Sequence, residues 1–222
     1  MKILGILGSP RDKGNTALLL EAVLKGAQAA GAETELIGLA GRDLQFCVAC
    51  GRCYATGACI HEDDVEMLKA KLAEADGIVL GSPNYMRSVT AQLKTLMDRC
   101  SLHVHCFLWT GKYGAAAATA GGSGEEQVAE FLTEFLQHCG ARTVGVAAAK
   151  GAGVGALVDQ EAALTGAASL GQDLVAAIRE KRTYAAQDSA HAAFSQRMKE
   201  LVTRMADKAP FQYEHWETMG WL

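Results

Sequence analysis

Four cysteines stand close together in the first third of the chain: Cys47, Cys50, Cys53 and Cys59. Their spacing, C-x2-C-x2-C-x5-C, lets consecutive thiolates curl around one cubane and is typical of iron–sulfur ligation. The residues between them are mostly small, which suits a loop that wraps tightly around such a group. The spacing therefore predicts an iron–sulfur site.

Two other uses of these cysteines stay open at this point, namely a zinc site and free thiols or a disulfide. A structural zinc site more often uses two C-x2-C pairs a dozen or more residues apart, because four ligands this close strain a tetrahedron. No signal peptide is evident, because the apolar run after Met1-Lys2 is short and lacks a cleavage site. We expect a cytoplasmic protein, in which thiols stay reduced and a cysteine cluster binds metal or is catalytic.

The remaining cysteines and histidines form no comparable pattern. Cys100 and Cys139 fall on or beside apolar helical faces, so we expect buried structural thiols. His103, His105 and Cys106 resemble a metal tripod, but positions i and i+2 of a helix do not share a face. We therefore interpret that segment as the end of a helix. No pair of carboxylates and no Ser/His/Asp set stands out, so we assign no catalytic acid or base.

A second group of residues that could do chemistry lies near the start of the chain. Gly8-Ser-Pro-Arg-Asp-Lys-Gly-Asn-Thr16 follows a short apolar run and precedes a helical pattern. A helix N-terminus offers free N–H groups and a positive dipole end, and Ser9, Arg11, Asn15 and Thr16 add side-chain donors. The loop therefore predicts a phosphate site, with an ordinary capped turn as the alternative. Neither a P-loop nor a Gly-x-Gly-x-x-Gly fingerprint is present in it.

Apolar runs alternate with amphipathic helical segments through the first two thirds of the chain. The runs predict five buried strands, at residues 2–7, 33–39, 77–81, 112–120 and 142–149. This alternation is typical of parallel βαβ units, so we predict a doubly wound α/β fold. The cysteine-rich loop, residues 40–62, interrupts the pattern after the second strand.

The last part of the chain, residues 159–222, has only helical patterns. Helices are predicted at 159–182 and 187–208, with Pro210 ending the second. An aromatic-rich tail follows, and it must pack on its own domain, over a cofactor or on a neighbouring subunit. We therefore divide the chain into a domain at 1–158 and an extension at 159–222, which either completes that domain or contacts another subunit.

Composition narrows the classes of partner. The chain has 222 residues, with 21 Lys+Arg against 25 Asp+Glu and a formal net charge of −4. This mild acidity argues against electrostatic binding of nucleic acid or of an anionic membrane surface. No uncharged apolar run approaches the roughly 18 residues of a membrane span.

Three loops of the chain resemble those of the flavodoxin-like flavin reductase family. They are the Ser9–Thr16 loop, the segment from Gly81 to Lys94 and the Gly-rich turn from Ala120 to Gly124. The resemblance covers about residues 1–150 and implies a flavodoxin-like, five-stranded parallel sheet of order 2-1-3-4-5 with FMN at its switch point. The residues that it implies for FMN binding are Ser9, Arg11, Asn15, Thr16, Pro83, Asn84, Tyr85, Met86, Ala120, Gly121 and Gly122.

The cysteine motif narrows the resemblance to the iron-sulfur flavoproteins, which carry such a motif after the second strand. It implies that Cys47, Cys50, Cys53 and Cys59 each ligate one iron of a [4Fe-4S] cluster. The acidic pair Asp63-Asp64 also matches that family. Two residues depart from the patterns: Arg87 replaces a small residue of the family, and Ile60 stands where ferredoxin motifs have proline.

The first functional hypothesis is an electron-transfer flavoprotein that uses FMN and the cluster to connect one-electron and two-electron partners. The resemblance implies a ferredoxin-like donor, a small-molecule acceptor and a homodimer or homotetramer in which the cluster of one subunit approaches the FMN of another. The second hypothesis is an NAD(P)H-dependent FMN or quinone reductase without a working cluster. The third is a redox-sensing or zinc-stabilised interaction module.

Overall fold

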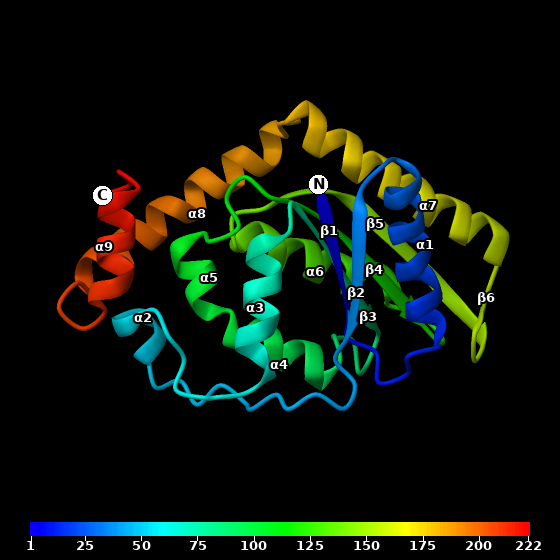
Figure 1. Ribbon diagram of the computed structural model, residues 1–222, viewed down its shortest axis with the longest axis horizontal. Helices are drawn as coiled ribbons and strands as arrows, with labels where there is room; N and C mark the ends of the chain where they lie inside the picture. The colour runs from blue at the N-terminus through cyan, green and yellow to red at the C-terminus, as the bar shows by residue number, and fades with distance from the viewer.

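The apolar runs become the strands of a central sheet with the order β2-β1-β3-β4-β5-β6. The computed structural model describes residues 1–222, and its helices cover both faces of this sheet (Figure 1). The strands are β1 (Lys2–Leu7), β2 (Glu33–Gly38), β3 (Gly77–Pro83), β4 (Tyr113–Ala120), β5 (Arg142–Gly153) and β6 (Ala156–Leu157). The helices are α1 (Asn15–Ala29), α2 (Arg52–Thr56), α3 (Asp64–Glu74), α4 (Ala91–Arg99), α5 (Ser101–Cys106), α6 (Glu125–His138), α7 (Gln160–Glu180), α8 (Ala185–Arg204) and α9 (Pro210–Thr218).

The predicted flavodoxin-like order is present in the first five strands, but the prediction of a five-stranded, wholly parallel sheet is wrong. Strand β5 continues to Gly153 and turns back through Val154 and Gly155 into β6, which pairs with it antiparallel. Gly155 has φ +73°, which a two-residue hairpin loop favours. The sheet is therefore mixed and has six strands. A strand of two residues is too short to leave a periodic signal in the sequence.

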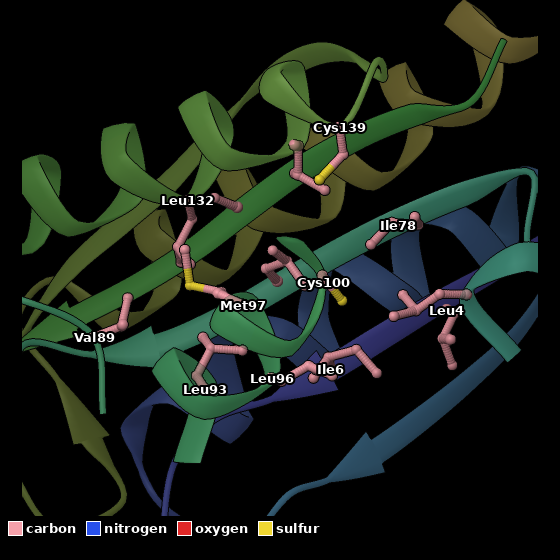
Figure 2. Packing of buried hydrophobic residues seen from close by; sticks show 14 of the residues in the cluster. Leu4, Ile6, Ile78, Val89, Leu93, Leu96, Met97, Cys100, Leu132 and Cys139 are labelled. Carbon is pink, nitrogen blue, oxygen red and sulfur yellow. The ribbon is translucent and has the colours of Figure 1, made fainter. Parts of the chain in front are cut away.

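The two faces of the sheet carry separate hydrophobic cores, because successive strand residues point to opposite sides. On β1, Leu4 and Ile6 pack against α3, α4 and α6 in one core, and Ile3 and Leu7 pack against α1 and α7 in the other. Figure 2 shows α4 laying Leu93 and its neighbours over β1 and β3 in the first core. The structure thus has three layers, with the sheet buried in the middle.

The C-terminal extension is divided between two places. Helix α7 belongs to the core of the sheet and packs along α1, whereas α8 leads away to α9 beside α5 (Figure 1). Pro210 does not end the second predicted helix: α8 ends at Arg204, and Pro210 begins α9. Proline is favoured in the first turn of a helix, where its missing N–H has no partner to lose.

The aromatic tail packs on its own chain. Trp216 is fully buried and lies against Phe107 at the end of α5, with 5.5 Å between the ring centroids. Met198 and Val202 of α8 complete this small third core. None of the helices combines the length and apolar character that a membrane span requires.

Candidate functional site

The loop between β1 and α1 lines a cavity and leads into the N-terminus of α1. The Ser9 hydroxyl accepts a hydrogen bond from the Arg11 N–H (3.0 Å) and donates one to the Arg11 carbonyl (3.1 Å). Helix α1 then begins at Asn15 with Gly14 as its N-cap and no side chain capping it. The first N–H groups of the helix and its positive dipole end are therefore available to an anion.

Asn15 and Thr16 cross-link this loop to its neighbours instead of capping the helix. The Asn15 amide donates to the Gly153 carbonyl (2.9 Å) and accepts from the Ala156 N–H (3.0 Å), which ties the loop to the β5–β6 hairpin. The Thr16 hydroxyl lies 2.7 Å from the hydroxyl of Thr119 at the end of β4. Both sets of hydrogen bonds lie at the carboxyl ends of parallel strands, where open α/β sheets bind ligands.

The loop after β3 is joined to the same edge. The buried Thr90 hydroxyl donates to the Gly8 carbonyl (2.6 Å), and the Asn84 side-chain amide donates to the Ser123 carbonyl (2.6 Å). The Asn84 N–H donates to the Thr119 carbonyl (2.6 Å). The Asn84 Oδ1 atom is buried but has no hydrogen-bond partner within the protein. It is therefore an acceptor that a bound ligand could satisfy.

A tight turn projects from this loop into solvent. Tyr85 and Ser88 pair with each other, and the two residues between them, Met86 and Arg87, have φ values of +50° and +65°. Such values are unfavourable for residues with a Cβ, so the turn holds local backbone strain. Met86 is 98% exposed, which places its side chain in solvent above the loop.

These loops enclose a cavity of about 490 Å³, within the range of small-molecule sites. Of the residues predicted to bind FMN, Met86 and Gly122 do not line this cavity. The predicted residues that line it are Ser9, Arg11, Asn15, Thr16, Pro83, Asn84, Tyr85, Ala120 and Gly121.

One wall of the cavity was not predicted from the sequence. Gly151, Ala152, Gly153 and Val154 of the β5–β6 hairpin line it, together with Gly14 and Thr119. The signal was present, because the segment Gly-Ala-Gly-Val-Gly follows the fifth predicted strand just as the other Gly-rich loops follow theirs. Asn15 holds this hairpin over the first loop, so the wall depends on a residue that was itself predicted.

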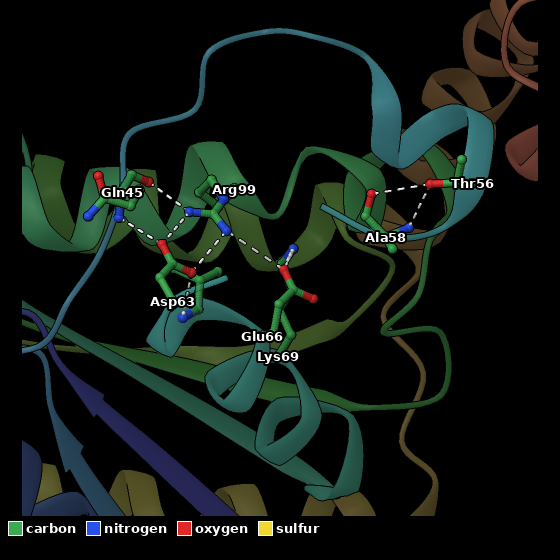
Figure 3. Close-up of polar contacts among 8 residues, drawn as sticks. Gln45, Thr56, Ala58, Asp63, Glu66, Lys69 and Arg99 are labelled. Carbon is green, nitrogen blue, oxygen red and sulfur yellow. Dashed lines mark hydrogen bonds and ion pairs between the residues drawn. The ribbon is translucent and has the colours of Figure 1, made fainter. Parts of the chain in front are cut away.

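The second site is the cysteine-rich loop, whose base is closed by a buried ion pair (Figure 3). Arg99 of α4 donates to both carboxylate oxygens of Asp63 (2.6 and 3.0 Å), and neither side chain is more than 1% exposed. The Gln45 N–H donates to Asp63 (2.7 Å), and the Gln45 carbonyl accepts from Arg99 (2.8 Å). The two ends of the loop are thereby joined to each other and to α4.

Asp63 is ionised in this arrangement. Burial alone would raise its pKa, but the hydrogen bonds from Arg99 and from the N–H groups of Gln45 and Val65 outweigh burial, and the pKa is lowered. The Val65 bond (3.1 Å) also makes Asp63 the N-cap of α3. Asp63 therefore has two roles: it caps α3, and it neutralises Arg99 beside the cysteines.

All four cysteines of the motif line one cavity of about 390 Å³. Cys47 and Cys50 are exposed, whereas Cys53 and Cys59 are partly buried. No three Cys, His, Asp or Glu side chains converge as they would around a single ion. Burial raises the pKa of the Cys53 thiol; the charge of Lys69 opposes this effect, and the three neighbouring cysteines add to it.

Two residues that line the same cavity have a buried side-chain nitrogen without a partner. Arg99 and His61 both line it, and the Arg99 Nε and His61 Nε2 atoms have no hydrogen-bond partner within the protein. Burial lowers the pKa of Arg99, but the hydrogen-bonded Asp63 carboxylate and the nearby Cys59 side chain outweigh burial and raise it. Hydrogen bonds and positive charge around thiolates and sulfides are the means by which proteins adjust iron–sulfur clusters. An all-thiol ligand set with such donors fits a cluster.

The other three thiols lie elsewhere and are inert. Cys100, Cys106 and Cys139 are fully buried, which confirms the prediction for Cys100 and Cys139. Burial raises the pKa of Cys100 and that of Cys106 to about 12, and it raises the pKa of Cys139 as well. They are therefore protonated thiols at neutral pH.

This chain is similar to known proteins along its whole length. The model of the NADPH-dependent FMN reductase family matches residues 1–153. An iron-sulfur flavoprotein of Archaeoglobus fulgidus is 33% identical over 100% of both chains. An iron-sulfur flavoprotein of Methanocaldococcus jannaschii is 43% identical over 141 residues, which cover 62% of this chain and 73% of that protein.

Solved structures agree on the fold. A flavodoxin, WrbA-like protein from Agrobacterium tumefaciens superposes with a TM-score of 0.59 at 18% identity, covering 82% of this chain and 98% of the other. The loops at the carboxyl ends of the strands and the cysteine motif indicate the same family as the family model and the relative that matches the whole chain. The chain therefore belongs to the NADPH-dependent FMN reductase family, its similar relatives are named iron-sulfur flavoproteins, and it is an FMN-dependent oxidoreductase.

Proposed function

We propose that this protein transfers electrons between a one-electron donor and a small two-electron acceptor, using FMN together with a [4Fe-4S] cluster on Cys47, Cys50, Cys53 and Cys59. The observation that carries the proposal is the cysteine cavity, which is lined by the four cysteines and by Arg99 and His61, each of which has a buried nitrogen without a partner. FMN exchanges two electrons and the cluster one, so together they connect the two kinds of partner.

The residues around the larger cavity supply binding and orientation. The N-terminus of α1, with Ser9 and Arg11, suits the phosphate group of FMN, because it offers N–H donors and positive charge. Asn84 suits a ring, because its buried Oδ1 can accept from a ligand N–H. Electron transfer requires no side-chain acid or base, so the proposal assigns no catalytic residue to this site.

The residues of the cysteine loop hold and adjust the cluster in this proposal. Thiolates are the iron ligands, so the cysteines must be reduced, which suits a reducing compartment such as the cytoplasm. Arg99 keeps a positive charge beside them, and Asp63 allows that charge to be buried. The Nε–H of Arg99 and the ring of His61 are free to donate to sulfur.

The two sites of one chain are well separated, which favours transfer between subunits. Figure 1 shows α2 at the opposite end of the molecule from the β5–β6 hairpin that lines the larger cavity. Exposed apolar side chains stand beside both sites: Phe46 and Val48 in the cysteine loop, Met86 and Val154 at the other cavity. Exposed apolar patches mark interaction surfaces. We therefore propose a homodimer or homotetramer in which the cluster of one subunit meets the FMN of another.

Anaerobic purification with analysis of iron, sulfide and flavin tests this function. We expect about four irons per chain and a broad absorbance near 400 nm that dithionite bleaches, together with bound FMN. Replacement of Cys53 by serine should remove the cluster absorbance and leave the flavin bands. The matched control is Cys100→Ser, at a buried thiol outside the loop, which should keep the iron.

The alternative functions give different results in the same preparation. FMN without iron or sulfide would refute the cluster and favour an NAD(P)H-dependent flavin or quinone reductase. Zinc with little FMN would favour an interaction module. Either result would contradict the proposed electron transfer between two cofactors.

A further inference from the structure

Helix α2 carries Cys53 and lies between Cys50 and Cys59, so its placement decides where three of the four thiols lie. It has five residues and none of them is buried. Helices this short are not stable by themselves, since nucleation is unfavourable and five residues add too few hydrogen bonds to offset it. Its position must therefore come from contacts with the rest of the chain.

The first such contact is with α9, the C-terminal helix. Gly57 ends α2 with φ +77°, and a Cβ atom at this glycine would lie 2.5 Å from the ring of Phe211. The ring thus packs directly against the backbone at the end of α2, two residues before Cys59. Figure 1 shows α2 and α9 side by side at one end of the molecule.

The second contact runs through α5. The ring of Tyr54 stacks on that of His105 with 4.3 Å between centroids and an interplanar angle of 17°. The Tyr54 hydroxyl hydrogen-bonds to that of Ser101. His105 is in turn held from α9, because its Nδ1 atom lies 3.0 Å from the Oε1 atom of Gln212. Tyr54 follows Cys53 directly, so this stack positions the centre of the motif.

Helix α9 is itself firmly attached. Trp216 is fully buried and donates to the His105 carbonyl (2.7 Å), and His215 Nε2 donates to the Cys106 carbonyl (2.9 Å). Gln212 is only 1% exposed. These contacts with α5 fix α9 independently of the cysteine loop.

We propose that α9 acts as a clamp for the cysteine loop, with Phe211 and Gln212 as its positioning residues. The Asp63–Arg99 pair closes the base of the loop, whereas the clamp holds α2 at the far side. Release of the clamp lets α2 open and the bound metal escape, while the FMN cavity, formed by other loops, is unaffected. The proposal rests on the proposed function only for the metal, since the clamp on α2 exists without it.

Hydrogen exchange in the full-length, FMN-containing protein tests the clamp. In Phe211→Ala, amide exchange over residues 51–58 should become about tenfold faster, because local opening exposes the Gly57 N–H that bonds Cys53 O in α2. Iron release to a chelator should accelerate similarly, with FMN content unchanged. The control is Phe131→Ala on α6, because Phe131 and Phe211 are both 36% exposed.

A pair of glycine substitutions separates the clamp contact from backbone strain. Gly57→Ala and Gly51→Ala both place a Cβ at positive φ, +77° and +73°, but only the first collides with Phe211. Gly57→Ala should therefore accelerate exchange in residues 51–58 more than Gly51→Ala does.

The outcomes separate the two proposals. Equal exchange and equal iron release in Phe211→Ala and Phe131→Ala would overturn the clamp, even if the wild-type protein holds its cluster. A wild-type chain without iron would overturn the cluster, while the exchange data would still decide the clamp.

Discussion

The carboxylate of Asp63 and the guanidinium of Arg99 are both withdrawn from water, and each is stabilised by the other. A buried charge without a partner would cost several kcal/mol, so neither residue can be understood alone. The sequence predicts Asp63 as a helix cap, since an aspartate precedes an apolar helical pattern. It does not predict the partner, because Arg99 lies 36 positions away on another helix and no local spacing relates them.

The side chain of His103 is a buried group whose titration changes the free energy of unfolding. Its side chain is 7% exposed beside Trp109, and its Nδ1 atom has no partner. Burial, with a smaller effect from the charge of Lys69, lowers the pKa of His103 from 6.5 to about 4. Between these pH values the unfolded chain binds a proton that the folded chain does not, so stability rises with pH in this window.

The free energy of unfolding should therefore fall on acidification from pH 7 to pH 4. The contribution of His103 is about 3 kcal/mol over that range, fully present above pH 6.5 and lost by pH 4. His103→Gln should lose this part of the pH dependence, as measured by urea unfolding at several pH values. Equal pH slopes for the wild type and the variant would contradict the assignment.

At the scale of elements, the closest packing is between α1 and α7 on one face of the sheet. A Cβ atom at Gly26 would lie 1.9 Å from the Ala168 carbonyl oxygen, and one at Gly171 would lie 1.9 Å from the Val23 carbonyl oxygen. These are contacts with backbone, which cannot rotate away. The two glycines therefore let the helices approach so closely that α7, though outside the predicted domain of residues 1–158, belongs to the same core.

Gly171→Ala should destabilise the protein by about 3 kcal/mol, because the two helices must separate. Gly166→Ala, on the same helix but with nothing within 4 Å of its Cβ position, should stabilise it by about 0.5–1 kcal/mol. Thermal or urea unfolding of the two variants measures both. A similar effect of the two substitutions would show that helix propensity, and not the contact with α1, decides the result.

The sequence predicts best the elements with a clear apolar pattern. The buried strands are short continuous apolar runs, and the helices between them carry apolar residues at spacings of three and four. Three elements were missed for physical reasons: β6 and α2 are only two and five residues long, and α9 begins at a proline that was expected to end a helix. The fixed φ of Pro210 suits the first turn of α9. A proline in the sequence can therefore mark the start of a helix as well as the end of one.

At the scale of the whole molecule, the sequence predicts which loops meet at the cavity because parallel strands place their carboxyl ends at one edge. It could not predict how the cysteine loop lies relative to that edge, since the loop has little regular structure and is held by α4, α5 and α9. The resulting separation of the two sites is a property of the tertiary structure alone (Figure 1). This separation is the reason that we propose electron transfer between two copies of the chain.

A stoichiometric reductive titration decides whether one chain stores electrons on two different cofactors, as we propose. The anaerobic protein, titrated with dithionite and followed at the flavin and cluster absorbances, should accept about three electrons per chain, two on FMN and one on the cluster. The Cys53→Ser variant should accept about two. Uptake of only two electrons by the wild-type protein, with flavin bleaching alone, would contradict the account.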